Sequence, residues 1–164
     1  MTTGMDTREG FAVVRAGGEF KLVAQREFTA GSRLFAVDGQ ITETPTRYSV
    51  QVGAGIHLDL PGGHAPEEMM DRFFWRFTNH SCAPNAQLRG REFFALRPIE
   101  PWQEITFHYE STEYEMAEPF DCHCGESACR GRIEGFRYRT EDEREQLRPM
   151  LADHLLAMLN VVHR

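Results

Sequence analysis

The stretch that decides the fold is residues 79–85 (NHSCAPN), which carry Cys82, one of the four cysteines in this 164-residue chain. The other three are bunched far downstream, with the spacing C-x-C-x4-C, at Cys122, Cys124 and Cys129. A structural zinc site is closed by four thiolate or imidazole ligands, and the bunched cysteines supply only three. We expect Cys82 to be the fourth ligand, with His123 as its competitor. The alternative is four ordinary thiols without a metal.

Length and composition indicate one folded domain without a membrane span. Hydrophobic residues make up 41% of the chain and charged residues 26%, which is typical of globular proteins. No apolar run approaches the roughly 18–20 residues that a membrane span needs, and the first ten residues lack a signal-peptide pattern. We therefore expect a cytoplasmic protein. The net charge of −7 argues against direct nucleic-acid binding and is compatible with a basic peptide as partner.

Hydrophobic patterning predicts a mainly β fold with few short helices. Alternating or apolar runs bounded by turn residues predict strands at 11–15, 20–24, 33–37, 48–52, 56–60, 92–96 and 104–109. Residues 67–77 are expected to form a helical turn. The segment 110–139 is polar and irregular, which suits a part of the chain that a metal organises.

The C-terminal segment predicts a helix that packs on the domain. Thr140 and Glu143 form a capping box, and Pro149 predicts a kink or a restart. The expected apolar stripe consists of Leu147, Leu151, Leu155, Met158 and Val162. This stripe favours docking within the chain, although self-association stays open, so the protein is expected to be a monomer or a dimer. We expect the chain to be divided into a main domain at residues 1–117, the cysteine-rich segment at 118–138 and the C-terminal helix at 139–164.

Three stretches resemble the signature motifs of SET-domain methyltransferases. Residues 79–85 are similar to NHSCxPN, residues 104–109 (EITFHY) to E-[IL]-T-F-D-Y, and residues 122–133 (CHCGESACRGRI) to the post-SET motif C-x-C-G-x4-C-R-G-x-I. The motifs occur in the family's order, and the chain looks like a small, stand-alone bacterial-type member. The resemblance implies a β-clip-like SET fold with a pseudoknot, transfer of a methyl group from S-adenosylmethionine to a protein lysine, and one structural zinc on Cys82 and the three bunched cysteines.

The resemblance also implies roles for individual residues. Tyr109 matches the active-site tyrosine, whose phenolic oxygen can accept weak C–H···O contacts and orient the amine. Phe107 matches an aromatic position where phenylalanine goes with more than one methyl transfer. The residues expected to line the cofactor pocket are Arg76, Phe77, Asn79, His80, Tyr109, Phe120 and Ile133. Because free lysine has a pKa of about 10.4, a narrow apolar channel should favour the neutral, nucleophilic amine.

Two departures from the family pattern keep other functions open. Residues 19–21 (EFK) stand where the family has a G-x-G turn beside the cofactor, and His108 replaces the aspartate of the second motif. The first alternative is a methyltransferase of a small-molecule amine. The second is a non-catalytic binding module that keeps the fold and the zinc.

Overall fold

Twelve short strands form five small sheets of two or three strands each in the described chain, which in this computed structural model comprises residues 9–60 and 62–162. One three-stranded sheet has the order β3 (Arg33–Ala36), β9 (Glu92–Ala95), β8 (Ala86–Arg89), and the other β4 (Gln40–Thr42), β6 (Ile56–Asp59), β5 (Val50–Gly53). The two-stranded sheets pair β1 (Phe11–Ala16) with β2 (Glu19–Ala24), β7 (Asn79–His80) with β10 (Thr106–Phe107), and β11 (Phe120–Asp121) with β12 (Arg132–Ile133). This confirms the mainly β expectation.

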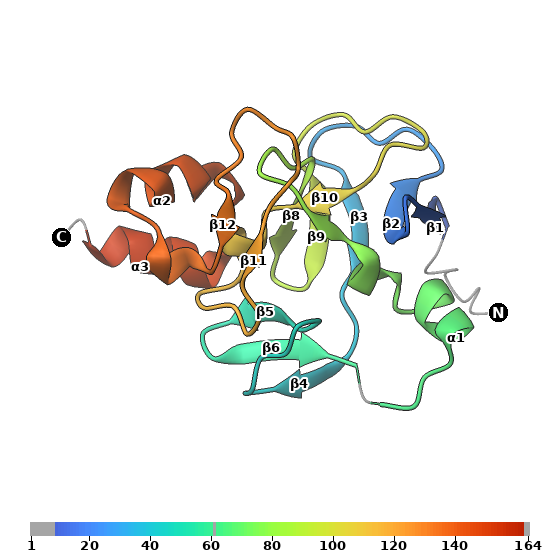
Figure 1. Ribbon diagram of the computed structural model, residues 1–164, viewed down its shortest axis with the longest axis horizontal. Helices are drawn as coiled ribbons and strands as arrows, with labels where there is room; N and C mark the ends of the chain where they lie inside the picture. The colour runs from blue at the N-terminus through green and yellow to red at the C-terminus, as the bar shows by residue number, and fades with distance from the viewer. Residues whose placement is uncertain (1–8, 61, 163–164) are drawn as a thin grey trace.

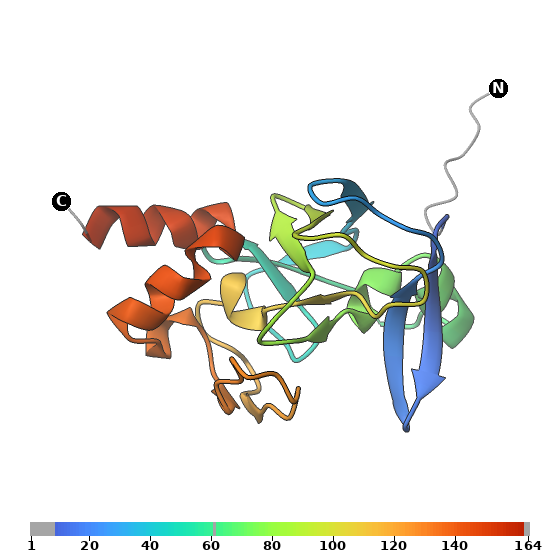
Figure 2. The same cartoon turned by 90° about the horizontal axis from the view of Figure 1, so that it is seen from above.

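The α-helices are short and lie at the two ends of the molecule. The α-helices are α1 (Pro66–Asp71), α2 (Glu141–Leu147) and α3 (Asp153–Val162), and single 3-10 turns are η1 (Phe74–Phe77), η2 (Tyr109–Ser111), η3 (Phe136–Tyr138) and η4 (Arg148–Met150). Figures 1 and 2 place α2 and α3 at one end and the β1–β2 hairpin at the other. Within the described ranges, every helix is too short or too polar to cross a bilayer.

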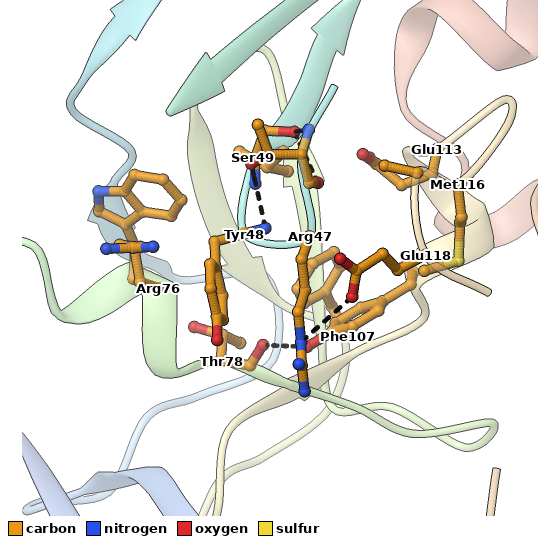
Figure 3. Close-up of a pocket in the computed structure, with 14 residues that line it drawn as sticks. Arg47, Tyr48, Ser49, Arg76, Thr78, Phe107, Glu113, Met116 and Glu118 are labelled. Atoms are coloured by element: carbon orange, nitrogen blue, oxygen red, sulfur yellow. Dashed lines mark hydrogen bonds and ion pairs between the residues drawn. The ribbon is translucent and has the colours of Figure 1, made fainter. Parts of the chain in front are cut away.

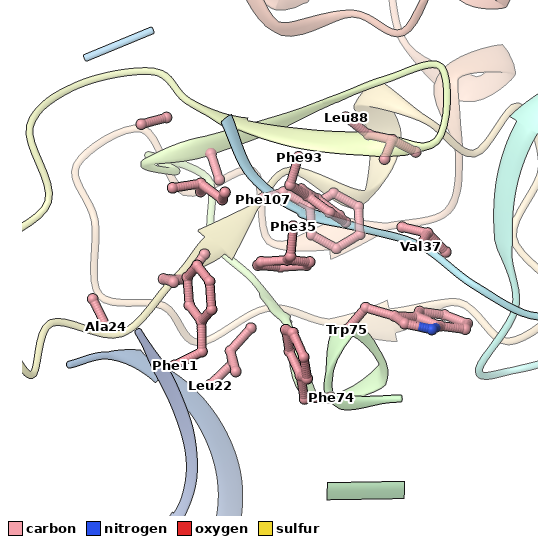
Figure 4. Packing of buried hydrophobic residues seen from close by; sticks show 14 of the residues in the cluster. Phe11, Leu22, Ala24, Phe35, Val37, Phe74, Trp75, Leu88, Phe93 and Phe107 are labelled. Atoms are coloured by element: carbon pink, nitrogen blue, oxygen red, sulfur yellow. The ribbon is translucent and has the colours of Figure 1, made fainter. Parts of the chain in front are cut away.

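An aromatic core lies between the hairpin and the β3–β9–β8 sheet (Figure 4). The Phe11 ring stacks on Phe74 at a centroid distance of 5.7 Å and meets Phe35 edge-on at 5.1 Å. Phe107 of β10 joins this core through an edge contact with Phe93 at 5.0 Å. Buried aromatic pairs of this kind add about 0.5–1.5 kcal/mol beyond the burial of their surface. The core therefore anchors the strand that leads into Tyr109.

The strand expected at 104–109 is shorter than predicted, and this correction matters for the site. Only Thr106 and Phe107 pair in a ladder, in parallel with β7. The Asn85 side chain accepts a hydrogen bond from the Thr106 backbone N–H at 2.9 Å and donates one to the Glu104 carbonyl at 2.8 Å. The Asn85 side chain thus takes the place of backbone partners at Thr106 and Glu104, while Glu104 forms only an isolated bridge with Val23 of β2. The chain then turns into η2 at Tyr109. The strand expected at 48–52 likewise begins only at Val50, because Thr46 and Ser49 form a turn.

The C-terminal segment folds as a capped helix that breaks near Pro149, as predicted. Thr140 and Glu143 form both hydrogen bonds of the capping box. The expected stripe is wrong at Met158, which is 41% exposed, whereas Leu159 is buried. The break restarts the helical register at Asp153, so that the inward face of α3 carries Leu155 and Leu159, four residues apart. The Val162 side chain lies outside the described residues.

Candidate active site and metal centre

The parallel pairing of β7 with β10 positions Tyr109. The pairing sets Phe107 opposite His80, and the chain beyond β10 brings the Tyr109 N–H to His80 Nδ1 at 3.1 Å. The Tyr109 hydroxyl donates a hydrogen bond to the Thr78 carbonyl at 2.9 Å. His80 of the first motif and Thr78, the residue just before that motif, therefore fix both ends of this tyrosine.

A narrow cavity of about 70 Å³ opens over Tyr109 and Phe107 (Figure 3). Trp75 and Thr78 belong to its wall, and the remaining lining residues are Thr46, Arg47, Tyr48, Ser49, Val50, Arg76, Glu113, Met116, Ala117 and Glu118. Figure 3 draws Arg76 and Glu113 on opposite sides, with Arg47 and Tyr48 between them. The Arg76 guanidinium lies over the Tyr48 ring at 4.7 Å, and Arg47 pairs with Glu118 at 3.7 Å.

Burial keeps Tyr109 and Glu113, two of the titratable groups that line this pocket, protonated to higher pH than usual. It raises the pKa of Tyr109 well above the ordinary value, and the negative charges of Glu113 and Glu104 raise it further. It also raises the pKa of Glu113 to about 7, although hydrogen bonds from Thr112 and the Gln51 backbone work in the opposite direction. The phenol of Tyr109 is therefore neutral at physiological pH, while Glu113 lies near the middle of its titration.

His80 connects this pocket to the cysteines. Its ring lies 5.3 Å from Tyr109 and 5.6 Å from Phe120, centroid to centroid, and burial lowers its pKa to about 4. The neutral ring accepts the Tyr109 N–H through Nδ1, so the proton is assigned to Nε2, which lies 3.2 Å from Cys82 Sγ. An N–H directed at a sulfur is a partner suited to a metal-bound thiolate.

The four cysteines meet in one cluster although Cys82 is far from the others in sequence. Their sulfur atoms all lie within 4.8 Å of one another, and those of Cys82 and Cys122 are 3.9 Å apart. Tetrahedral zinc with Zn–S bonds of about 2.3 Å requires sulfurs about 3.8 Å apart. The 3.9 Å separation is also far longer than a disulfide bond of about 2.05 Å. The donor set therefore fits zinc, and His123 is exposed outside the cluster.

The residues predicted from sequence fall into two neighbouring groups. Ile133 is fully buried beside Cys82 and Cys122, and Phe120 packs at the edge of this cluster together with Tyr109. Arg76 lines the pocket over Tyr109, whereas Phe77 and Asn79 turn toward the hairpin. The Phe77 ring contacts Phe20 at 5.4 Å, and Asn79 Nδ2 donates to the Phe20 carbonyl at 2.9 Å. The segment that replaces the G-x-G turn therefore still contacts this motif.

Two acidic residues that follow Tyr109 were missed from the sequence, because no motif contains them. Glu110 is fully buried, pairs with Arg139 at 2.7 Å and accepts hydrogen bonds from the Glu134 and Gly135 N–H groups, each at 3.0 Å. Glu113 is 8% exposed and lines the pocket. The two glutamates are three residues apart, which is only a weak signal of a helical turn. From the sequence alone, this spacing does not predict that either side chain is buried.

The comparisons with known proteins agree with this geometry. The SET domain family model matches residues 19–110. The methyltransferase flvH of Aspergillus flavus is 36% identical over 94 residues, which cover 55% of this chain and 47% of that protein. The H3 lysine-36-specific histone-lysine N-methyltransferase of Yarrowia lipolytica is 30% identical over 131 residues, covering 71% of this chain and 17% of that one.

Solved structures give the same fold. KRYPTONITE in complex with mCHG DNA and SAH has a TM-score of 0.55 at 25% identity, over 73% of this chain and 28% of that one. The Arabidopsis thaliana SUVH6 structure in complex with SAM has a TM-score of 0.57 at 20% identity, over 77% of this chain and 34% of that one. This chain spans less than half of each of these four proteins. The family model covers more than half of this chain, and the chain belongs to the SET-domain family.

Proposed function

We propose that this protein is an S-adenosylmethionine-dependent N-methyltransferase that acts on a protein lysine side chain. The observation that carries the proposal is the Tyr109 hydroxyl, which the Thr78 carbonyl holds in place at a narrow pocket beside Phe107. The names of the relatives support it, because they describe a methyltransferase and a histone-lysine N-methyltransferase. Two similar structures contain SAM or its product SAH.

The chain's own residues supply orientation and desolvation for this reaction. When bound, S-adenosylmethionine supplies an electrophilic methyl group on a sulfonium. Because the Tyr109 proton is engaged by Thr78, the phenolic oxygen keeps its lone pairs for weak C–H···O contacts and for an amine N–H. The Phe107 and Trp75 side chains exclude water from the pocket wall. Holding two reactants in such a near-attack arrangement can lower the barrier by about 7–11 kcal/mol.

We propose that the cofactor lies against the face formed by His80, Phe120 and Ile133, with Asn79, Arg76 and Phe77 at its edges. The packing of Phe120 against both His80 and Tyr109 supports this placement, since it connects that face to the pocket. The Asn79 amide is held by the Phe20 carbonyl and by Glu104 Oε2 at 3.0 Å. These two contacts orient the motif from the hairpin side.

The cysteine-rich segment is proposed to be a post-SET motif that holds one structural zinc. Cys82, Cys122, Cys124 and Cys129 fill all four positions, so the site would be closed and would serve folding rather than catalysis. Elemental analysis should find about one zinc per chain in the wild type. Cys82→Ser should lose it, while His123→Ala should retain it. Full zinc occupancy in Cys82→Ser would show that the fourth ligand is wrong.

Transfer of labelled methyl groups to proteins of a cell extract tests the proposed activity. Tyr109→Phe should lower the initial rate at least tenfold, because the oriented phenolic oxygen is lost. Tyr138→Phe is the matched control, since Tyr138 is 49% exposed and lies outside the pocket. Label in small molecules alone would favour the small-molecule alternative. Absence of both transfer and cofactor binding would favour the non-catalytic module.

Two finer properties belong to the same proposal. Phe107 has no hydroxyl with which to hold a water beside the amine, which supports di- or trimethylation. Exclusively monomethylated product at long reaction times would contradict this. The net charge of −7 supports a basic protein as the substrate rather than a nucleic acid. We further propose that the enzyme acts in the cytoplasm.

A further inference from the structure

Glu113 is a buried acid that the mechanism above leaves unused. Its side chain lines the same pocket as Tyr109 and Phe107, and it is 8% exposed. Removing a carboxylate from water without a counter-ion is costly, so a buried acid usually lies beside a cation. Glu113 has no ion-pair partner within 4.0 Å among the residues that the structure describes.

The arginines of the pocket are engaged elsewhere. Arg47 pairs with Glu118, and Arg76 lies over the Tyr48 ring on the opposite side from Glu113 (Figure 3). The hydrogen bonds that Glu113 accepts are both neutral, from the Gln51 N–H at 2.9 Å and from Thr112 Oγ1 at 2.7 Å. Both reach Oε2, which leaves Oε1 available to a ligand in the pocket.

We propose that Glu113 is the counter-ion that receives the substrate's ammonium group in the pocket and thereby selects a cationic amine. The inference rests on the proposed function, since it names the group that recognises the lysine side chain. A lysine ammonium carries the positive charge that the pocket wall lacks near Glu113, and it brings three N–H donors for the available oxygen. The neutral phenol of Tyr109 cannot provide that charge. Glu113 thus recognises the ammonium form as it enters the pocket. The ammonium then loses one proton to solvent, and Tyr109 orients the resulting neutral amine for transfer.

An alternative is that Glu113 only connects two parts of the backbone. The Gln51 side chain accepts the Tyr114 N–H at 2.9 Å, so that Gln51 and Glu113 join β5 to the segment after η2 reciprocally. Glu113→Gln separates the two roles. The amide oxygen of glutamine can still accept both hydrogen bonds of Oε2, whereas the negative charge is lost.

The test measures binding of n-pentylammonium and of neutral 1-pentanol by NMR titration of the full chain loaded with zinc and S-adenosylhomocysteine, near pH 8. The wild type should bind pentylammonium about tenfold more tightly than pentanol, as expected for one charge-assisted hydrogen bond. Glu113→Gln should bind both alike. Glu115→Gln is the matched control and should keep the preference, because Glu115 pairs with Arg137 and Tyr138 outside the pocket.

The outcomes separate this inference from the proposed activity. A wild type without a preference for pentylammonium, or a Glu113→Gln variant that keeps it, overturns the role of Glu113, whatever the methylation assay shows. A preference that depends on Glu113 in a protein that methylates no protein overturns only the proposed function. Unchanged amide NMR spectra away from the pocket verify that Glu113→Gln is folded.

Discussion

Two buried glutamates three residues apart divide the segment after Tyr109 into a structural region and a pocket region. Glu110 lies where this segment meets the C-terminal part of the chain, and its carboxylate is matched by Arg139 and by two backbone N–H groups. Glu113 lies at the pocket, where it accepts two neutral hydrogen bonds and has no cation beside it.

The difference lies in what each site leaves unsatisfied. A buried charge that is fully paired explains its own presence, since it joins elements of the fold. Burying a charge that has no partner costs free energy that no contact within the fold offsets. Such groups cluster at functional sites. The same residue type in one short segment therefore serves two purposes, which only its surroundings distinguish.

The largest expected effect on stability concerns Glu110, the glutamate of the structural region. Glu110→Gln should lower the free energy of unfolding by about 3 kcal/mol, because it removes the charge opposite the nearly buried Arg139. Urea unfolding of zinc-loaded protein measures the change. The double variant Glu110→Gln with Arg139→Met is the control and should recover part of the loss. A change below about 1 kcal/mol in the single variant would show that the ion pair of Glu110 with Arg139 does not stabilise the fold.

The sequence predicts the reactive tyrosine and the metal ligands better than it predicts the residues that line the pocket. Tyr109 and the cysteines lie in motifs whose spacing is local. Counting zinc ligands favours Cys82 as the fourth ligand and leaves His123 as its competitor, and the cluster of four sulfurs in the structure agrees with Cys82. The burial of Glu113 depends on Gln51, 62 residues earlier in the chain. Likewise, the short β10 depends on the side chain of Asn85, which takes the place of backbone partners. Such long-range contacts leave no periodic signal in the sequence.

An intermediate effect is expected for Glu113 in the pocket, where replacing the glutamate should increase the free energy of unfolding at high pH. Because burial raises the pKa of Glu113 to about 7, the folded state holds its proton more tightly than the unfolded state does. The contribution of Glu113 to stability is therefore present at low pH and is lost as the pH rises through about 7. Glu113→Gln lacks this loss. Relative to the wild type, it should gain about 2 kcal/mol between about pH 5.5 and about pH 8.

Urea unfolding of both proteins at the two pH values measures this gain. Glu115→Gln provides the control, because that carboxylate is exposed and pairs with Arg137 on the surface. Equal effects of Glu113→Gln at both pH values would mean that Glu113 is ionised throughout this range. Glu113 would then be a stably charged buried carboxylate, like Glu110. A gain together with weaker ammonium binding would show that the pocket charge reduces stability while serving recognition.

The smallest expected effect concerns Thr112, whose hydroxyl donates to Glu113 Oε2 at 2.7 Å. Thr112→Val keeps the shape of this fully buried side chain and removes the donor. Because that hydrogen bond lowers the pKa of Glu113, its loss should move the midpoint of the pH dependence above about 7 and cost about 1 kcal/mol near pH 8. In the Glu113→Gln background the same substitution should leave the pH dependence unchanged, since no titrating group remains there. An equal shift in both backgrounds would place the titration elsewhere and would remove the distinction between the two glutamates.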